Sequence, residues 1–239
     1  MKKLLFAFLI FSIAVIPARA QKVINDLNAE KRVVTDFHGI DVGTGIRLTL
    51  TGGNVEEVAV SAATPEFRDK IITKVENGVL KIYYESKPNA INTNKERKEL
   101  KAYVSYKTLD KLEANTGAEV EIEGTVESPF LKMNANTGAR INGKINSADL
   151  EVDQNTGSVI TLSGNADKLN VEGSTGSKFE GTDLVSSICN ARVSTGARIS
   201  VTANKELTAK ANTGGNVKYK GDPSVKEIRR HTGGSVSKI

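Results

Sequence analysis

Apolar and polar residues alternate with a period of two through most of the chain, and from residue 109 the alternation is tied to a recurring Thr-Gly pair. Counted from each threonine, positions −4 and +4 are apolar in every repeat, and position +2 is always small. Most charged residues fall at odd positions. Because a strand with one buried face alternates in this way, we expect one strand before and one strand after each Thr-Gly pair.

The Thr-Gly pair recurs seven times at nearly constant spacing. The pairs are Thr116-Gly117, Thr137-Gly138, Thr156-Gly157, Thr175-Gly176, Thr195-Gly196, Thr213-Gly214 and Thr232-Gly233. Successive threonines are 21, 19, 19, 20, 18 and 19 residues apart. Such a period predicts a solenoid with one structural unit per repeat. We therefore predict an all-β fold, a parallel β-helix, and right-handed winding because parallel crossovers are right-handed.

The Thr-Gly pair itself fits a corner between two strands. Glycine accepts positive φ without a Cβ clash. Position −1 is polar in all seven repeats: Asn115, Asn136, Asn155, Ser174, Ser194, Asn212 and His231. In stacked coils these side chains would form a column and hydrogen-bond from coil to coil. We therefore predict a structural role for the Thr-Gly pairs, and a second turn near a later glycine such as Gly124, Gly164 or Gly221.

The N-terminal half follows the same alternation less regularly. Thr44-Gly45 has apolar residues at −4, −2, +4 and +6, which predicts an eighth, divergent coil. Thr64-Pro65 predicts a short helix start, Asn77-Gly78 predicts a hairpin within residues 72–84, and the polar residues 86–98 predict a loop. We find no linker. We therefore expect one elongated domain over residues 21–239, irregular to about residue 108 and regular from about residue 109.

The first 20 residues have the features of a secretory signal peptide. Lys2 and Lys3 precede an apolar run of about 13 residues and the small-residue site Ala18-Arg19-Ala20, so we expect cleavage before Gln21. No cysteine lies at this site, which argues against a lipoprotein anchor, and no later segment is apolar enough to span a membrane. The mature chain would carry 30 basic and 28 acidic residues. This balance argues against nucleic acid as a partner.

Residues that could perform catalysis or bind a cofactor are few and scattered. Cys189 occupies position −6, which is leucine in the other middle repeats, so we expect a buried side chain. His231 falls in the polar column, and His38 has no evident partner. No zinc, P-loop or nucleophile-elbow motif is present. We therefore predict no catalytic, cofactor-binding or metal-binding residue.

Two charged clusters have alternative interpretations. Glu119, Glu121 and Glu123 project from one strand face, where a calcium site is the alternative to an ordinary solvated face. Arg229 and Arg230 form a small basic cluster next to His231. We favour the solvated face for the glutamates, since outward alternating charges are normal on a half-buried strand.

The mature chain resembles a bacterial family of unknown function that is common in Bacteroidetes, the putative autotransporter-adhesin head GIN domain. The segments Phe37-His38-Gly39-Ile40-Asp41-Val42 and Asn77-Gly78-Val79-Leu80-Lys81-Ile82 carry the resemblance, together with repeats of the type Leu112-x-x-Asn115-Thr116-Gly117-Ala118. The resemblance covers about residues 34–220. It implies a secreted or envelope-associated single-stranded right-handed β-helix.

We therefore expect an exported, non-catalytic and adhesin-like protein of the periplasm, cell surface or external medium that binds an envelope protein or a glycan. One alternative is a polysaccharide-active enzyme, although the repeats lack clustered catalytic groups and aromatic residues. A second is a structural or assembly role in the envelope. The last repeat shows no evident cap, and an open solenoid end can pair with another chain. That predicts self-association through the solenoid ends, or coverage of the open end by another segment.

Overall fold

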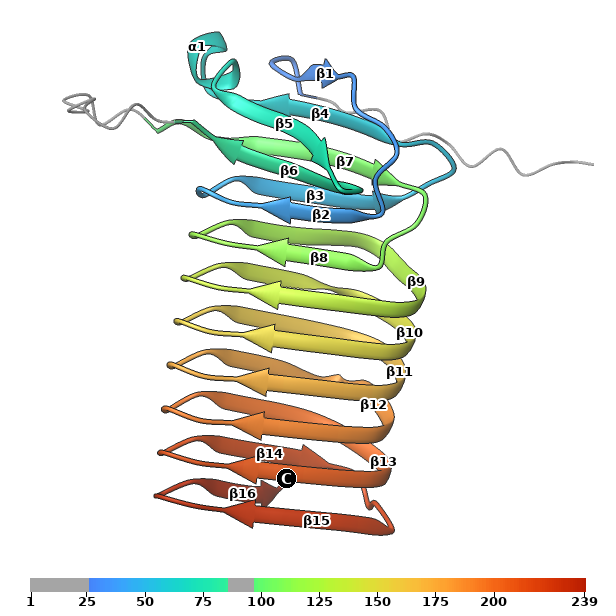
Figure 1. Cartoon of the computed structure of the whole chain (residues 1–239), viewed down its shortest axis with the longest axis vertical. Helices are drawn as coiled ribbons and strands as arrows, with labels where there is room; N and C mark the ends of the chain where they lie inside the picture. Colours follow the sequence, from blue (N-terminus) through green and yellow to red (C-terminus); the bar gives the residue numbers. More distant parts are fainter. Residues whose placement is uncertain (1–25, 86–96) are drawn as a thin grey trace, which may run out of the picture.

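The computed structural model describes residues 26–85 and 97–239, which contain sixteen β-strands and one short helix. The strands pair into one continuous system that winds around a single core (Figure 1). The fold is the predicted all-β, single-stranded, right-handed parallel β-helix. The expected signal peptide, its cleavage site and residues 86–96 of the expected loop lie outside the described residues.

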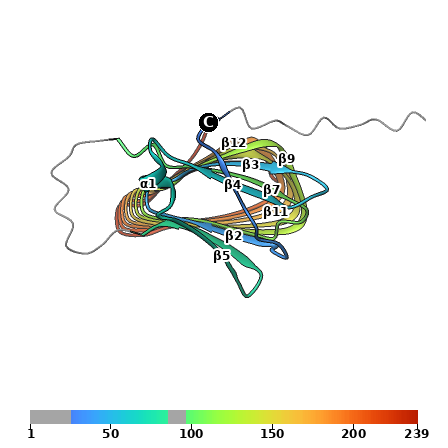
Figure 2. The same cartoon turned by 90° about the horizontal axis from the view of Figure 1, so that it is seen from above.

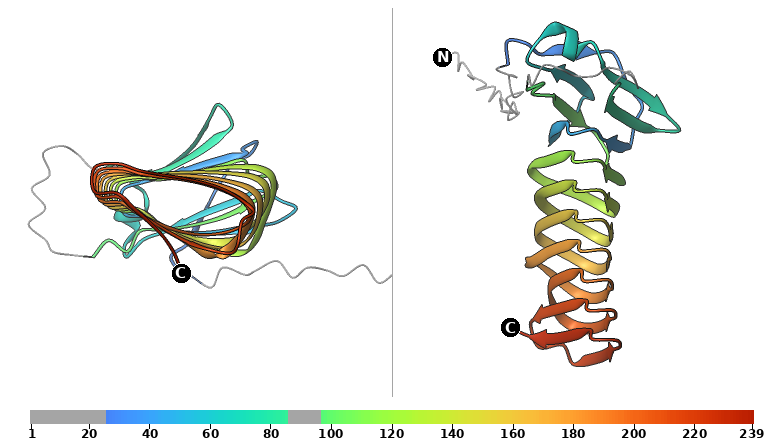
Figure 3. Two further views of the ribbon diagram at one scale, coloured as in Figure 1. Left: turned by 90° about the horizontal axis from the view of Figure 1, so that it is seen from below. Right: turned by 90° about the vertical axis from the view of Figure 1, so that its left-hand side faces the viewer.

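Five long strands form the regular part of the solenoid. They are β9 (Glu119–Ala135), β10 (Arg140–Gln154), β11 (Val159–Gly173), β12 (Lys178–Val193) and β13 (Arg198–Ala211). Each pairs in parallel with the strand one repeat away, so that Leu150 lies opposite both Leu131 and Leu169. Viewed along the axis, the coils superimpose closely (Figure 3).

Each coil has two long sides, which stack into two parallel sheets. We call the segments that lead into the Thr-Gly turns the front sheet and the segments that follow these turns the back sheet (Figure 1). Inward positions of both sheets fill the space between them, as the alternation predicts. The column at position +4 is buried: Val236 is 6% exposed and the other six residues are at most 1% exposed, namely Val120, Ile141, Ile160, Phe179, Ile199 and Val217. Burial of such side chains contributes roughly 1.5–3 kcal/mol each, repeated in every coil.

The two edges of the solenoid differ in how the chain reverses. At one edge, each coil makes a Thr-Gly turn. At the opposite edge, which we call the bend, β9 to β13 continue from the back sheet into the front sheet without an interruption of the strand. The second turn predicted near Gly124 and Gly164 is therefore a bend within a strand, although both glycines adopt positive φ there (80° and 110°). Gly221 (φ 101°) does lie between two strands.

The predicted eighth coil exists, but its neighbours follow a different order from the sequence. β2 (Gly39–Val42) and β3 (Arg47–Gly52) flank Thr44-Gly45 and stack on β8 (Lys111–Ala114) and the start of β9. On the other side they pair with β6 (Val79–Tyr84) and β7 (Lys101–Tyr106). Segments that come later in the chain therefore lie further from the C-terminal end than β2 and β3 do.

Antiparallel strands cover the N-terminal end of the solenoid, and we call this region the N-terminal cap. β4 (Glu57–Ser61) pairs with β7, β1 (Glu30–Arg32) pairs with β4, and β5 (Ile71–Glu76) pairs with β6. Helix α1 (Pro65–Arg68) lies above them (Figures 1 and 2). The expected helix start is confirmed, since Thr64 Oγ1 accepts from Phe67 N at 3.4 Å. The expected hairpin joins β5 to β6.

The C-terminal end is built from three short strands, β14 (Asn216–Lys220), β15 (Val225–Arg230) and β16 (Ser235–Lys238). β14 and β15 pair in parallel with β13, and β16 pairs in parallel with β14. In the described part of the chain no further strand pairs with the outer side of β15 or β16. The two ends of the solenoid are therefore closed differently.

Candidate functional site

The structure places every Thr-Gly pair in a tight turn at one edge of the solenoid. In the seven predicted pairs and in Thr44-Gly45, the threonines have φ of 46–53° and the glycines have φ of 68–74°. Two central residues with positive φ define a type I′ turn. The residue at +2 donates its N–H to the carbonyl at −1 over 2.8–3.3 Å. Positive φ is rare for β-branched threonine. The turn therefore imposes an unfavourable backbone conformation on the threonine as well as a positive φ on the glycine.

Backbone hydrogen bonds join these turns into a ladder. Each turn glycine from Gly45 to Gly214 donates its N–H to the carbonyl of the threonine one coil further on, over 2.9–3.1 Å. The threonines are exposed at this edge, and Thr44 Oγ1 also accepts from Tyr84 N at 2.7 Å. The edge therefore uses its backbone groups to hold the coils together, which suits a structural role for the Thr-Gly pairs.

The polar column at position −1 makes hydrogen bonds between coils in its first part. Asn115 Nδ2 donates to Asp41 Oδ1 at 3.0 Å, and Asn136 Nδ2 donates to Asn115 Oδ1 at 3.3 Å. Further along, Ser174 Oγ donates to Asn155 Oδ1 at 3.0 Å. Burial raises the pKa of the Asp41 carboxyl, while the hydrogen bond from Asn115 opposes that rise. The column thus connects adjacent coils at the surface.

The two histidines lie at opposite ends of the solenoid. His38 Nδ1 is 2.8 Å from Asp110 Oδ1, so the expectation that His38 has no partner is wrong. Its ring packs on the hairpin turn, because a Cβ on Gly78 would lie 2.3 Å from His38 Nε2. His231 is exposed near the C-terminal end and donates its backbone N–H to Ala211 O. The structure does not bring the two histidines together.

Cys189 is fully buried, as its place in the leucine column predicts. It lies in register between Leu169 and Leu207. Burial raises the pKa of its thiol to about 12, so the reactive thiolate is suppressed at neutral pH. This cysteine acts as a core residue.

Two of the three clustered glutamates of β9 contact neighbouring side chains. Glu119 Oε2 lies 3.2 Å from Arg47 Nε, and Thr51 Oγ1 donates to Glu123 Oε2 at 3.5 Å. Within residues 26–85 and 97–239, no group of three His, Cys, Asp or Glu side chains is arranged to hold a metal ion. Both Glu119 and Glu123 contact side chains of the neighbouring strand β3.

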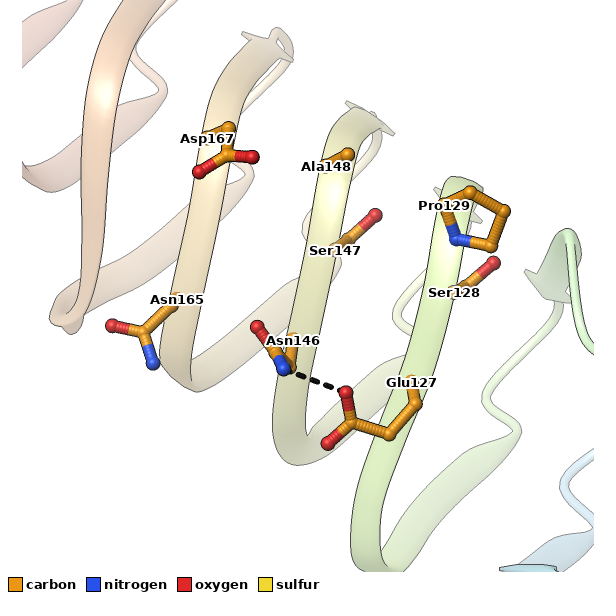
Figure 4. Close-up of a pocket in the computed structure, with 8 residues that line it drawn as sticks. All are labelled: Glu127, Ser128, Pro129, Asn146, Ser147, Ala148, Asn165 and Asp167. Atoms are coloured by element: carbon orange, nitrogen blue, oxygen red, sulfur yellow. Dashed lines mark hydrogen bonds between the residues drawn. The ribbon is translucent and has the colours of Figure 1, made fainter.

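A shallow groove of about 400 Å³ crosses three coils at the bend (Figure 4). We call it the bend groove, and its lining residues are Glu127, Ser128, Pro129, Asn146, Ser147, Ala148, Asn165 and Asp167. The register of β10 with its two neighbours aligns Glu127, Asn146 and Asn165 in one outward row. Strand stacking therefore repeats a planar polar side chain roughly every 4.8 Å along the groove.

The polar groups of the bend groove are partly committed to one another and partly free. Glu127 Oε2 accepts from Asn146 Nδ2 at 2.6 Å, and Ser147 Oγ donates to the Asp149 carbonyl at 2.9 Å. Asn165 and Asp167 are exposed, and neither has a side-chain partner among the described residues. In the described part of the chain, no lysine or arginine lines the groove. It therefore offers amide and carboxylate groups, which suit hydroxyl-rich uncharged ligands.

The bend groove was not among the residues that we expected to be functional. Its row lies ten residues before each threonine, at Glu127, Asn146 and Asn165. A repeating outward polar position was therefore readable in the alignment. That position lies beyond the residues that flank the Thr-Gly turn, in a region where the sequence predicts a turn and the structure has a bend within a strand.

A second shallow groove of about 400 Å³ lies on the front sheet beside the Thr-Gly edge. At this place the polar column has the small side chains of Ser174 and Ser194 instead of asparagine, and Gly173 has no side chain. The groove occupies the space that larger side chains would fill. Glu172 Oε1 and Arg192 Nη1 face each other across it at 2.6 Å. This groove carries both charges and therefore has less distinct ligand chemistry than the bend groove.

Residues 36–223 match the family model described as "Putative auto-transporter adhesin, head GIN domain". No curated protein matches the chain. Among the described residues, no helix is long and apolar enough to cross a bilayer.

Several solved structures share the fold. A putative adhesin from Bacteroides fragilis matches with a TM-score of 0.77 and 19% identity, over 88% of this chain and 96% of its own. A putative adhesin from Parabacteroides merdae matches with a TM-score of 0.70 and 14% identity, over 88% and 95%. A protein described as a putative lipid binding protein, from Parabacteroides distasonis, matches with a TM-score of 0.68 and 20% identity, over 90% and 98%. At these identities the likeness concerns the fold.

Proposed function

The chain belongs to the family of putative auto-transporter adhesin head GIN domains, and on that premise we propose that it is an exported, non-catalytic adhesin-like protein that binds a neutral glycan in the bend groove. The family and its adhesin-named structural neighbours support a binding role at the cell envelope. The glycan and the groove are our own assignment.

The observation that carries this proposal is the row of planar polar side chains in the bend groove. Asn165 and Asp167 present an amide and a carboxylate to solvent without internal partners in the described structure. Sugar hydroxyls donate and accept hydrogen bonds, and they match such groups well. The repeat also suits a polymer, because successive coils offer successive contacts along one line. Phe130, which is 41% exposed, follows Pro129 directly and adds apolar surface beside the groove.

A glycan array containing neutral and acidic sugars tests the assignment. The protein should bind a neutral glycan, and the double variant Asn146→Ala/Asn165→Ala should weaken that binding about tenfold, since each lost hydrogen bond costs roughly 0.5–1.5 kcal/mol. The matched control is Asn142→Ala/Asn204→Ala, which removes two exposed asparagines outside the groove. Equal losses in both double variants, or no binding to any neutral glycan, would refute the assignment.

One observation favours a second candidate, a polysaccharide-active enzyme. Glu127 and Asp167 both line the bend groove, and glycoside hydrolysis commonly uses a pair of carboxylates. Glu127→Gln and Asp167→Asn separate the two functions. Binding with no release of reducing ends from a bound polysaccharide supports the non-catalytic protein, whereas release that either variant abolishes supports the enzyme.

Export is the remaining element of the proposal. It rests on the sequence of residues 1–20 and on the envelope role of the family. Expression of the full chain in a Gram-negative host followed by N-terminal sequencing tests it. We expect a mature N-terminus at Gln21 in the periplasm, outer membrane or medium. A chain that keeps Met1 in the cytoplasm would contradict export.

A further inference from the structure

Charge is distributed unevenly along the axis of the solenoid. Residues 109–189 contain 6 Lys and Arg against 13 Asp and Glu, whereas residues 190–239 contain 10 against 3. Their net charges are therefore −7 and +7. The second segment lies at the end of the solenoid opposite the N-terminal cap (Figure 1). We call residues 190–239 the cationic pole.

The last coil carries cations at positions where earlier coils have apolar side chains. The register aligns Lys226, Arg230 and Lys238 with inward-facing apolar residues of the preceding coil. Lys226 Nζ lies 5.7 Å from the centre of the Tyr219 ring, and Arg230 Nη2 donates to Val236 O at 2.9 Å. A further coil would bury these cations at high cost, so the residues themselves mark the end of the core. No further segment of the described residues covers this end.

Three further lysines of the cationic pole have no acidic partner among the described residues. Lys205, Lys218 and Lys220 are exposed, and no carboxylate of the described residues lies within ion-pair distance of them. They are distributed around the axis. Lys205 lies at the bend, between the back-sheet and front-sheet parts of β13, while Lys218 and Lys220 lie on the back sheet. In the front sheet, Arg230 has no carboxylate of the described residues within ion-pair distance, whereas its neighbour Arg229 pairs with Glu227. The pole is thus cationic on several sides and not along a single groove.

We propose that the cationic pole docks end-on onto an anionic lipid surface, with the N-terminal cap directed away from it. Cations that surround an axis match a charged plane better than a single extended polymer, which needs a line of contacts. Val225, 58% exposed at the same end, adds an apolar side chain. Juxtamembrane basic clusters bind anionic membranes through this combination of charge and limited apolar contact.

The ends of a second copy offer a poorer fit to the pole. Another cationic pole would repel it, and residues 26–108, which include the N-terminal cap, contain 13 basic and 12 acidic residues and are nearly neutral. Inward-pointing charges also protect open sheet edges from pairing with other chains. These features disfavour association through the solenoid ends and leave an anionic surface as the matching partner.

Vesicle flotation with residues 21–239, the chain expected after leader removal, tests the proposal. The protein should float with vesicles of phosphatidylcholine and phosphatidylglycerol, and not with phosphatidylcholine alone. The variant Lys205→Gln/Lys218→Gln/Lys220→Gln should lower the partition coefficient roughly a hundredfold, since each basic residue near an anionic membrane contributes about fivefold. Added salt should weaken the binding of the unmodified chain.

The matched control neutralises three exposed cations in the acidic segment, Arg140→Gln/Lys144→Gln/Lys178→Gln, and changes the net charge by the same amount. It should retain binding. Equal losses in both triple variants, or equal flotation with neutral vesicles, would overturn the proposal. Preferential binding to soluble polygalacturonate would instead assign the pole to an acidic polysaccharide, and salt-sensitive self-association would assign it to a second copy. The bend-groove variants should not affect flotation, so this test is independent of glycan binding.

Discussion

The two ends of this solenoid face the same physical problem and are closed in different ways. A stacked coil leaves unpaired backbone groups and an exposed core at each end. At the N-terminal end, β4 and β5 satisfy the backbone by antiparallel pairing, and α1 lies above them. At the C-terminal end, the backbone edges of β15 and β16 stay open and cationic side chains cover the core.

Closing an end of the solenoid and stabilising that end are separate tasks in this molecule. The N-terminal cap adds buried residues, since Leu80 and Ile82 of β6 are fully buried beneath it. The cationic pole adds little burial, because most residues of β15 are exposed. We therefore expect the N-terminal cap to contribute to stability, and the cationic pole to contribute to solubility and to the choice of partner.

The largest effect should come from truncating the same inward column at each end. Leu80 (0% exposed) lies beneath β5, whereas Ile228 is only partly buried. Leu80→Ala should lower the free energy of unfolding by about 2–5 kcal/mol, and Ile228→Ala should cost roughly 1 kcal/mol or less because little cavity forms. Urea denaturation measures both. Similar losses in the two variants would show that the ends are equally packed.

A second variant should convert the cationic end into an apolar one. Lys226→Leu/Arg230→Leu/Lys238→Leu extends the apolar columns of the preceding coil to the surface, so the open edges lose their protection. We expect concentration-dependent association in sedimentation velocity. The control Arg140→Leu/Lys144→Leu/Lys178→Leu, on exposed positions of the coil sides, should stay largely monomeric. If the end variant remained monomeric at high concentration, the cations would not be what keeps the edges apart.

A turn glycine should matter more inside the solenoid than at its open end. Gly157 (φ 68°) donates its N–H to Thr175 O at 3.0 Å, whereas Gly233 (φ 74°) lies in the last coil. A Cβ meets no close atom at either site, so alanine adds only left-handed strain of about 1–2 kcal/mol. Gly157→Ala should show this loss in full in thermal unfolding, and Gly233→Ala should show less, because the last coil can rearrange. The reverse order would mean that the last coil is as constrained as the middle.

The regular half of the fold could be predicted because each coil repeats the same local information. Position +4 and the leucine column fixed which side chains are buried, including Cys189. The fold of the N-terminal half was harder to predict, since the alternation identifies strands but not the strands with which they pair. Nothing local to Leu80 or Ala102 indicates that β6 and β7 stack outside β2 and β3. Long-range pairing of that kind depends on the packing of the whole chain.

The candidate site was predictable only in part for a related reason. The Thr-Gly turns are evident in the sequence. The positive φ of the threonines is not, because it contradicts the usual preference of a β-branched residue. The bend groove depends on the register that aligns Glu127, Asn146 and Asn165, and that row is visible only once the bend is known. His38 and Asp110 are 72 residues apart, so their contact has no local signal at all.

The smallest expected effect concerns two surface carboxylates, one at each end. Hydrogen bonds from Lys74 and Lys81, at 2.7 and 2.6 Å, lower the pKa of Glu76 to about 2 from the ordinary 4.5. At the other end, a hydrogen bond from Lys238 at 3.1 Å lowers the pKa of Asp222. Because both pKa values are depressed in the folded state, each group stabilises the protein above its ordinary pKa, and that contribution is lost as pH falls through the depressed value.

NMR titration of the side-chain carboxyl carbons should resolve the difference between the ends. Glu76 should titrate near pH 2, and Lys74→Gln should move its pKa back towards 4.5 while leaving Asp222 unchanged, because the two groups lie at opposite ends of the solenoid. Asp222, with one lysine donor against two for Glu76, should lie closer to its own ordinary value. If Glu76 titrated near 4.5 in the unmodified protein, its two lysines would be solvated and the cap would owe its stability to burial and backbone pairing alone.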